Sequence, residues 1–195
     1  MTPQEIRKIS KKLSLLLRHK PELYGLTLDR QGWCEVDALL AAFRQNGQIL
    51  PQEVLETVVS QNDKRRFSFS EDGRRIRANQ GHSIDVDLGY EAMQPPETLY
   101  HGTATRFLDR IFEVGLQKQQ RHHVHLSPDV ETASKVGARH GKLAILSIDA
   151  NRMADDGHIF YRSANGVWLT DKVPVKYFQL YEVPPTTNRA PKELE

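Results

Sequence analysis

Arginine and histidine side chains occur close together at several places in this chain, and they are the residues best suited to chemistry. A guanidinium can bind a phosphate through two parallel hydrogen bonds, and an imidazole can hold or move a proton near neutral pH. Such a set stabilises the charge on phosphates and does little else. Basic residues also gather at helix ends because the helix dipole favours them, so one pair alone defines no site. The set comprises Arg18-His19, Arg65-Arg66, Arg121 and Arg139-His140.

Other kinds of site find little support in the sequence. No pair of carboxylates flanks a pocket motif, no serine lies in a nucleophile elbow, and Cys34 has no suitably placed histidine. His122, His123 and His125 crowd one predicted strand, where alternation puts His123 and His125 on one face and His122 on the other. No carboxylate or cysteine lies nearby at a metal-ligand spacing, so we expect no metal.

The composition describes a globular chain with two local basic clusters. Of the 195 residues, 38% are hydrophobic and 27% are charged, and the net charge is only +2. Residues 1–20 hold six basic side chains against one acidic, and residues 64–77 hold six against two. Such clusters weakly favour a polyanionic partner, although solvated charged faces are common. The single cysteine permits no disulfide framework, and no apolar run reaches membrane-spanning length, so we expect a cytoplasmic protein without a membrane partner.

The first half of the chain predicts three helices followed by a hairpin. A capping box at Thr2–Glu5 starts a helix that Pro21 ends, and apolar spacing predicts further helices over 36–46 and 51–61. The pattern then alternates over 66–79 around a Glu-Asp-Gly turn. Three helices and a basic hairpin are the layout of a winged helix, a class that often binds nucleic acid and sometimes only protein.

The second half of the chain follows a predicted linker over 85–97, which lacks periodicity and contains Pro95-Pro96. Beyond it, short strands and helices occur without the regularity of βαβ units. The predicted strands are 98–103, 123–127, 143–148, 167–169 and 175–183, and the predicted helices are 107–114 and 129–140. The fold class is therefore α+β, with one lobe over 1–94, a second over 95–184, and a tail over 185–195 that we expect to be disordered.

Seven short motifs stand in order along the chain: LLLRHKPE, KRRFSF, RANQGHSI, LYHGT, RHHVHLS, KVGARHG and NGVWL. Each is weak by itself, but together they run from Arg18 to Leu169 and span nearly the whole sequence. In this order they resemble the RNA 2'-phosphotransferase family, the KptA-like, NAD-dependent tRNA 2'-phosphotransferases. The resemblance implies a winged-helix lobe that binds RNA, followed by a lobe that resembles ADP-ribosyltransferases and binds NAD.

The resemblance also implies a reaction and its catalytic residues. The family removes an internal 2'-monophosphate from RNA, whose phosphate attacks the anomeric carbon of the NAD ribose, expels nicotinamide and forms an ADP-ribosylated RNA phosphate. The ribose 2''-hydroxyl then attacks phosphorus, which leaves 2'-OH RNA and ADP-ribose 1'',2''-cyclic phosphate. Carried onto this sequence, the catalytic set is Arg18, His19, Arg66 and Arg121, where Arg66 matches because it directly precedes Phe67.

The residues that the resemblance assigns to NAD lie in the second half. His101-Gly102-Thr103 resembles a turn that holds a ribose, and its glycine lets a ligand approach the backbone. His125 stands where many relatives carry a tyrosine, and Val167 where protein-modifying relatives carry a catalytic glutamate. A phosphate is already anionic near neutral pH, so a phosphate acceptor needs no general base there. The implied set also includes Ser127, Arg139, His140 and Asn165.

Two alternative functions stay open at this point. The same NAD lobe and phosphate clamp could ADP-ribosylate terminal phosphates of RNA or DNA, because attack on the anomeric carbon needs only an anionic phosphate. A non-catalytic winged-helix binder could instead use its second lobe to sense NAD or ADP-ribose, but this leaves the spacing of Arg18-His19 and Arg121 unexplained. The physiological RNA stays open. Nothing periodic indicates a coiled coil, so we expect a monomer.

Overall fold

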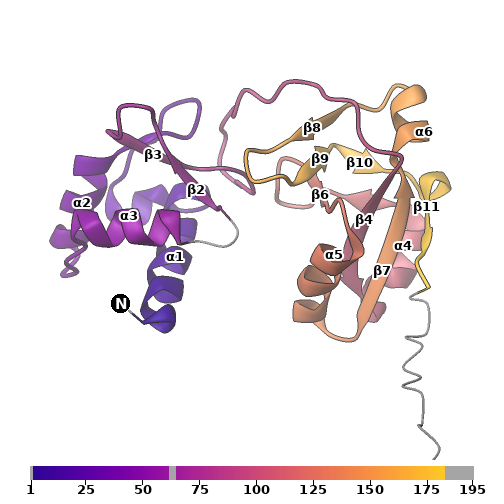
Figure 1. Ribbon diagram of the computed structural model, residues 1–195, viewed down its shortest axis with the longest axis horizontal. Helices are drawn as coiled ribbons and strands as arrows, with labels where there is room; N and C mark the ends of the chain where they lie inside the picture. Colours follow the sequence, from indigo (N-terminus) through magenta and orange to yellow (C-terminus); the bar gives the residue numbers. More distant parts are fainter. Residues whose placement is uncertain (1, 62–64, 183–195) are drawn as a thin grey trace, which may run out of the picture.

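The computed structural model describes residues 2–61 and 65–182, and its elements gather in two groups that lie side by side (Figure 1). Helices and sheets are mixed, which confirms the α+β class. Two clusters of buried hydrophobic residues form the cores. The members of the first lie in the sequence from Leu13 to Ala78, and those of the second from Leu99 to Phe178. We call the surrounding groups the first and the second lobe. The division expected between residues 94 and 95 stays a prediction, and the expected tail over 185–195 lies outside the described residues.

Helix α1 (Pro3–Arg18) begins at the predicted capping box. The Thr2 hydroxyl accepts a hydrogen bond from the Glu5 backbone N–H at 3.2 Å, and the Glu5 carboxylate accepts one from the Thr2 N–H at 2.7 Å. Leucines at helical spacing are fully buried along one face of the helix. The helix ends at Arg18, with His19 as its C-cap. The Arg18-His19 pair is therefore fixed at the end of a helix that is anchored in the first core.

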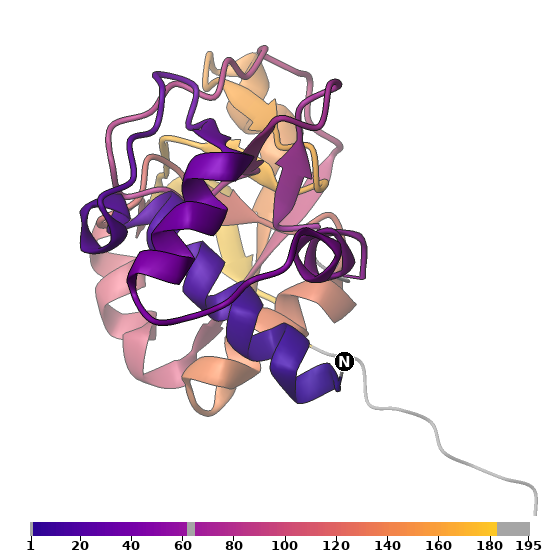
Figure 2. The same cartoon turned by 90° about the vertical axis from the view of Figure 1, so that its left-hand side faces the viewer.

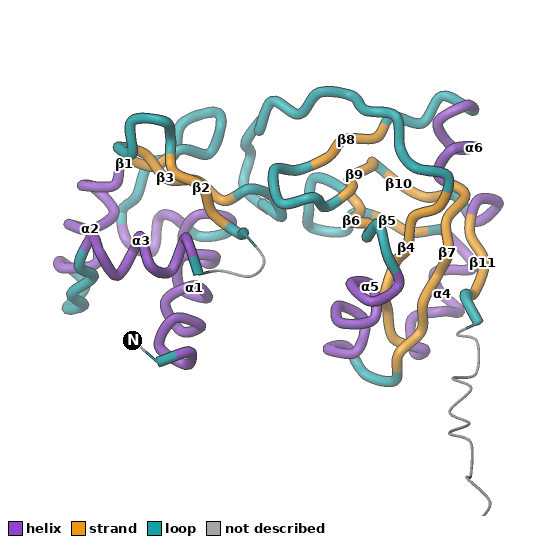
Figure 3. Tube along the Cα trace, in the orientation of Figure 1, coloured by secondary structure: helices purple, strands orange, loops and turns teal. Residues whose placement is uncertain are grey.

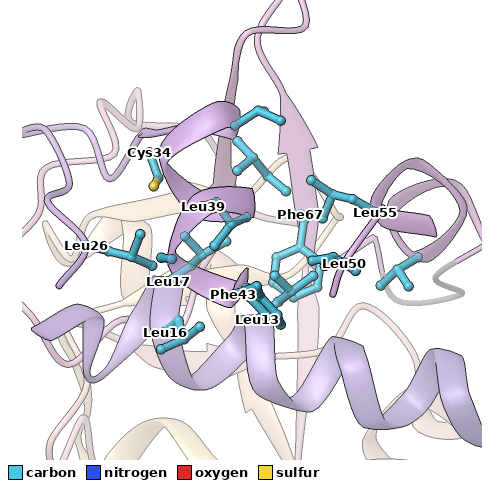
Figure 4. Close-up of a cluster of buried hydrophobic side chains, with 14 of the residues drawn as sticks. Leu13, Leu16, Leu17, Leu26, Cys34, Leu39, Phe43, Leu50, Leu55 and Phe67 are labelled. Atoms are coloured by element: carbon cyan, nitrogen blue, oxygen red, sulfur yellow. The ribbon is translucent and has the colours of Figure 1, made fainter. Parts of the chain in front are cut away.

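Helices α2 (Val36–Gln45) and α3 (Gln52–Ser60) and a small antiparallel sheet complete the first lobe. The sheet has the order β1-β3-β2, with β1 at Cys34–Glu35, β2 at Phe67–Phe69 and β3 at Arg75–Ala78. The hairpin of β2 and β3 was predicted, whereas β1 is too short to show an alternating pattern. Figure 4 shows Phe67 of β2 inside the first core, near Leu13 and Phe43.

Residues 79–97 connect the two lobes as a loop, which we call the strap (Figure 3). The strap contains the predicted linker and is hydrogen-bonded to both lobes. Near its start, the Ser83 N–H donates to the Arg18 carbonyl at 2.9 Å, and the Asp87 N–H donates to the Arg30 carbonyl at 2.7 Å. Near its end, the Met93 N–H donates to the Phe160 carbonyl at 2.8 Å.

The second lobe is built from two three-stranded antiparallel sheets, of order β11-β7-β4 and β6-β9-β8. Tyr100 and Ser127 join the two sheets, because the N–H of each donates to the carbonyl of the other at 2.8 Å. Seen from the side of the first lobe, the helices of that lobe lie in front of these strands (Figure 2). The strands are β4 (Thr98–Ala104), β6 (Val124–Leu126), β7 (Leu143–Asp149), β8 (Phe160–Arg162), β9 (Trp168–Thr170) and β11 (Phe178–Leu180), with a separate pair of β5 (Leu116–Gln117) and β10 (Lys172–Val173).

Short helices pack around these sheets and correct several predicted boundaries. They are α4 (Leu108–Val114), α5 (Val130–Gly137), α6 (Ala150–Asp155) and the 3-10 turns Thr105–Phe107, Ala138–His140 and Val175–Tyr177. A further 3-10 turn, Pro21–Tyr24, packs against α1 in the first lobe. The strand predicted over 175–183 was wrong in its first part, because the chain forms a 3-10 turn after Pro174 before β11 begins. Helix α6 was missed because so short an element shows no readable helical period. None of the helices in the described ranges has the length and apolar character to cross a bilayer.

Two glycines allow α5 to lie directly on β4. A methyl group built on Gly102 would lie 1.8 Å from the Ala133 carbonyl oxygen of α5, far inside van der Waals contact. One built on Gly137 would lie 2.8 Å from the backbone nitrogen of Thr103. The helix and strand therefore approach more closely than any side chain would permit, and this contact fixes the backbone around His101-Gly102-Thr103.

Candidate active site

Arg18 lies where the first lobe faces the second. Its Nη2 donates to the Arg66 carbonyl at 3.4 Å, and its guanidinium lies over the Phe67 ring, 5.8 Å from the centroid. The buried Nε of Arg18 has no hydrogen-bond partner among the described residues. Burial and the neighbouring positive charges of Arg66 and Arg121 lower the pKa of Arg18 to about 10. The side chain stays charged at neutral pH, with its stacking and its backbone contact holding it in place.

His19 is oriented by the strap. Its Nδ1 and the Ser83 hydroxyl are 2.9 Å apart, while the Ser83 backbone N–H holds the Arg18 carbonyl. Partial loss of solvent and the positive charges of Arg18 and Arg121 lower the pKa of His19, although much of the residue is exposed. Ser83 thus fixes both members of the pair. The neutral imidazole that results can both donate and accept a hydrogen bond.

Arg66 immediately precedes β2 and is held by Asn79 at the start of the strap. The Asn79 N–H donates to the Arg66 carbonyl at 2.9 Å, and the Asn79 side-chain amide donates to the Arg65 carbonyl at 2.6 Å. The amide oxygen of Asn79 accepts from the Ser68 hydroxyl at 2.8 Å. Asn79 is buried, so these bonds tie the segment that carries Arg66 to the hairpin.

Arg121 approaches from the second lobe and is paired with His125 of β6. Its Nη1 lies 2.6 Å from His125 Nδ1. Because a guanidinium can only donate, His125 Nδ1 is the acceptor and the imidazole proton is on Nε2. Burial and the charge of Arg121 lower the pKa of His125 to about 3, so the ring is neutral at physiological pH. Partial desolvation also lowers the pKa of Arg121, although much of its side chain is exposed.

The four predicted catalytic side chains therefore come together at the junction of the lobes. The charges of Arg66 and Arg121 both act on Arg18, and those of Arg18 and Arg121 both act on His19. The strap residue Gly81 lies between the lobes here, because a methyl group on it would be 3.8 Å from Arg18 Nη1 and 3.6 Å from His125 Cε1. We call Arg18, His19, Arg66 and Arg121 the clamp.

Two arginines of the clamp lack a carboxylate partner within the described ranges. Within the described ranges, no carboxylate forms an ion pair with Arg18 or Arg121. Positive groups that are partly withdrawn from water repel one another unless an anion lies between them. The arrangement therefore favours a ligand with at least one negative charge and several acceptor oxygens.

His101 of β4 faces the clamp through His125. Its Nδ1 lies 3.0 Å from the His125 carbonyl, and since a carbonyl can only accept, Nδ1 carries the proton. Burial is the main cause that lowers the pKa of His101, so Nε2 is left as an acceptor. His125 thus contacts Arg121 through its ring and His101 through its backbone, and it couples the predicted phosphate site to the predicted NAD site.

Three other predicted NAD residues, Ser127, Asn165 and Val167, lie near the ends of strands β6, β8 and β9. Ser127 is bonded to Tyr100, and extending the register of β6 and β9 by one residue places it opposite Val167. Asn165 and Val167 flank the turn between β8 and β9, where Ser163 holds both through its hydroxyl. His101 therefore lies on β4, Ser127 directly follows β6 and Val167 directly precedes β9, while their assignment to NAD stays a prediction.

Four predicted NAD residues have a less direct relation to the site. Gly102 packs against α5, and Thr103 is buried with its backbone beside Gly137. The group that approaches the Gly102 backbone closely is therefore helix α5, whereas the sequence predicted a ligand there. His140, in the exposed turn after α5, lies near enough for its charge to lower the pKa of His101. Among the described contacts, none joins Arg139 to these residues.

The structure corrects the expected arrangement of the three clustered histidines. Strand β6 begins only at Val124, so His122 is not held by the alternation of the strand. His122, His123 and His125 all line one cavity instead of two opposite faces. Over residues 2–61 and 65–182, no group of three metal-binding side chains is placed to hold an ion.

Sequence reasoning missed the supporting residues of the strap. Asn79, Gly81 and Ser83 hold or separate the clamp residues, although none was assigned a role. All three lie within the motif RANQGHSI, and this was the available signal. Motif membership could not show that these residues contact Arg18, His19 and Arg66, because those contacts join segments far apart in the chain.

Arginines from two lobes that converge on one place, with no carboxylate paired to Arg18 or Arg121 among the described residues, are the arrangement of a protein that binds a phosphate-type anion. Comparison with known families agrees with this class. Residues 4–172 match the family described as RNA 2'-phosphotransferase, Tpt1 / KptA family, and the chain belongs to it. The resemblance of the seven motifs is thereby confirmed.

Curated relatives support the same assignment over nearly the whole chain. A protein of Hahella chejuensis named "Probable RNA 2'-phosphotransferase" is 57% identical over 183 residues, which cover 93% of this chain and 98% of the relative. Proteins of the same name from Pseudomonas fluorescens and Streptomyces coelicolor are 53% and 52% identical over 180 and 179 residues. These alignments cover 92% of this chain in both cases, and 99% and 97% of the relatives.

Proposed function

We propose that this protein removes an internal 2'-monophosphate from RNA and transfers it to NAD. The products are 2'-OH RNA, nicotinamide and ADP-ribose 1'',2''-cyclic phosphate, formed by way of an ADP-ribosylated RNA 2'-phosphate. The observation that carries the proposal is the clamp, in which positive side chains from both lobes converge without a carboxylate partner for Arg18 or Arg121. Family membership supports the substrate class.

The clamp residues have distinct tasks in this proposal. Arg18, Arg66 and Arg121 bind the oxygens of the 2'-phosphate and offset the charge that builds on phosphorus when its ester bond to the RNA breaks. His19, held neutral and oriented by Ser83, can donate a hydrogen bond to the phosphate or move a proton during that step. The phosphate itself needs no base, because its second pKa is about 6.

The residues of the second lobe fit a ribose of NAD. His101 presents an unprotonated Nε2 as an acceptor for a ribose hydroxyl, because its Nδ1 is committed to the His125 carbonyl. Bound NAD supplies an electrophilic anomeric carbon and nicotinamide as leaving group. Val167 stands where a protein-modifying relative would place a carboxylate, and a hydrophobic residue there leaves the approach open to an anionic acceptor.

The proposed division of labour assigns RNA to the first lobe and NAD to the second. Three helices and a three-stranded antiparallel sheet, whose β2–β3 hairpin follows α3, support a winged-helix interpretation of the first lobe. The two facing sheets and the positions of His101, His125 and Val167 on them support an ADP-ribosyltransferase-like interpretation of the second. We also expect a cytoplasmic monomer.

The test is product analysis with an oligonucleotide that carries one internal 2'-phosphate. With NAD present, mass spectrometry should show the loss of the 2'-phosphate from the oligonucleotide and the appearance of ADP-ribose 1'',2''-cyclic phosphate. With NAD omitted, the oligonucleotide should stay intact. A stable ADP-ribose adduct would favour terminal-phosphate ADP-ribosylation instead. An unchanged oligonucleotide in a single-turnover reaction would reject the proposal and leave the non-catalytic binder as the alternative. In that case the wild-type protein has no turnover, so the substitution His19→Ala removes none.

A further inference from the structure

The cavity lined by His122, His123 and His125 adjoins the clamp, and of the residues that line it only His125 has a role in the proposed chemistry. Its volume is about 140 Å³, and it lies between the strap and one face of the β6-β9-β8 sheet. His125, Leu169 and Tyr161 are paired across the three strands and line this face, while the opposite face belongs to the second core. Gly81 forms part of its wall, and a methyl group built on Gly81 would lie 3.8 Å from Arg18 Nη1 of the clamp. A ligand at the clamp therefore lies next to the cavity.

His82 is the polar group that the protein leaves without a partner in this cavity. The side chain lines the cavity, is 1% exposed, and neither ring nitrogen has a hydrogen-bond partner among the described residues. Burying an imidazole without hydrogen bonds costs free energy unless a bound group supplies them. The neutral ring offers one donor and one acceptor, because burial lowers its pKa to about 3.

Aromatic rings form much of the remaining wall. Tyr90 of the strap lies 6.2 Å from His123 and 6.3 Å from Tyr161, and the latter two rings are 5.4 Å apart, between centroids. The Tyr90 hydroxyl donates to the Asn79 carbonyl at 2.5 Å, which fixes that ring over the cavity. Val86 and Leu169 add apolar surface. Such a wall suits a flat, neutral, polar-edged group.

Other ligand classes fit the cavity less well. An anion would meet Asp87 at the rim and histidines that are held neutral, and the arginines that attract anions lie in the clamp. A metal ion would need at least three suitable side chains in reach, and the described part of the chain provides no such group. A drug-sized ligand needs roughly 300 Å³ or more, which exceeds the space present.

We propose that this cavity binds a nucleobase of the RNA, at or next to the nucleotide that carries the 2'-phosphate. His82 hydrogen-bonds the edge of the base, and Tyr161 and its neighbouring rings contact the face. A neutral imidazole can pair with a donor or an acceptor of any base, so the pocket senses that a base is present and tolerates different sequences. The inference rests on the proposed function for the identity of the ligand.

The first test compares three oligonucleotides that carry the same 2'-phosphate. One is complete, one is abasic at the phosphorylated nucleotide, and one is abasic at its 3' neighbour. For wild type, we expect removal of the base at one of these positions to raise KM about 10-fold, the scale of one lost base–aromatic contact. For Tyr161→Ala and His82→Asn, the abasic and complete substrates should differ by less than about 2-fold. Phe112→Ala removes an exposed aromatic ring on α4 and should keep the wild-type difference. Equal KM values in wild type, or an unchanged difference in both variants, would overturn the inference.

A binding measurement separates this inference from the proposed function. Two short RNAs with a 2'-phosphate, one with 2-aminopurine at the phosphorylated nucleotide and one with it at the 3' neighbour, are titrated with protein in the absence of NAD. Stacking of the base in the cavity quenches its fluorescence. We expect quenching by wild type and Phe112→Ala, and much weaker quenching by Tyr161→Ala. Thermal unfolding of each variant checks that it is folded. Turnover without quenching at either position would overturn the base pocket alone, whereas quenching without phosphate removal would overturn the proposed reaction alone.

Discussion

At the scale of single residues, the proposed chemistry depends on fixed protonation states and on arginine rather than on positive charge in general. Arg121 can only donate to the His125 ring, so it fixes the tautomer of His125. The His125 carbonyl can only accept from the His101 ring, so it fixes the tautomer of His101. The guanidinium of Arg18 is held by a ring and by a carbonyl. A flexible ammonium would reproduce the charge but not these directions.

The substitution Arg66→Lys tests this requirement. We expect turnover of a 2'-phosphorylated oligonucleotide to fall about 10- to 100-fold, because lysine loses the bidentate fork. Arg65→Lys is the matched control, since Arg65 is an exposed neighbour outside the predicted clamp, and its rate should stay within about 2-fold of wild type. Near-normal single-turnover rates for Arg66→Lys would remove Arg66 from the clamp.

His82 predicts a pH dependence of stability. Its pKa is lowered from 6.5 to about 3 in the folded protein, so below pH 6.5 the unfolded chain binds a proton that the folded protein does not. The free energy of unfolding should therefore fall as the pH drops from about 6.5 towards 3, by at most about 1.4 kcal/mol per pH unit from this residue. Urea unfolding of wild type and His82→Leu between pH 7 and pH 4.5 measures the difference. The variant should lose less stability on acidification, and parallel curves would contradict the assignment.

At the scale of elements, the sequence predicts best where a pattern is long. The capping box and apolar spacing of α1, and the alternation of β2 and β3, predict elements that the structure confirms. Elements of two to six residues, such as β1 and α6, carry too few positions to show a period. Residues 85–97 of the strap were predicted as a linker, but the contacts that residues 79–83 make with the clamp were not predicted, because a segment without periodicity does not indicate its partners. The clamp residues were predicted through the resemblance, whereas Asn79, Ser83 and His82 needed the structure.

The contact between β4 and α5 gives a prediction at this scale. Gly102→Ala should destabilise the protein by about 3 kcal/mol or more, because the new methyl group would overlap the Ala133 carbonyl and move the helix. Gly73→Ala provides the comparison, since Gly73 has φ of 71° in the β2–β3 turn and open space around it. That change adds only backbone strain of about 1 kcal/mol. Chemical denaturation should rank the two variants in this order, and a smaller effect for Gly102→Ala would show that α5 can shift freely.

At the scale of the whole molecule, the site exists because two lobes meet. Arg18, His19 and Arg66 come from the first lobe and Arg121 from the second, while the strap supplies residues that hold the three from the first lobe. His125 extends this link to His101, so a change at the phosphate site reaches the predicted NAD site through one residue. Such coupling suits a reaction in which an RNA phosphate and an NAD ribose must meet.

The most direct test of this account counts nicotinamide against phosphate. Wild-type protein is mixed in excess with RNA that carries one internal 2'-phosphate and with NAD, and both released nicotinamide and remaining 2'-phosphate are measured over a single turnover. The account predicts one nicotinamide for each 2'-phosphate lost, and no release with the matched 2'-OH RNA. Loss of phosphate without nicotinamide, or release of nicotinamide that ignores the 2'-phosphate, would contradict it.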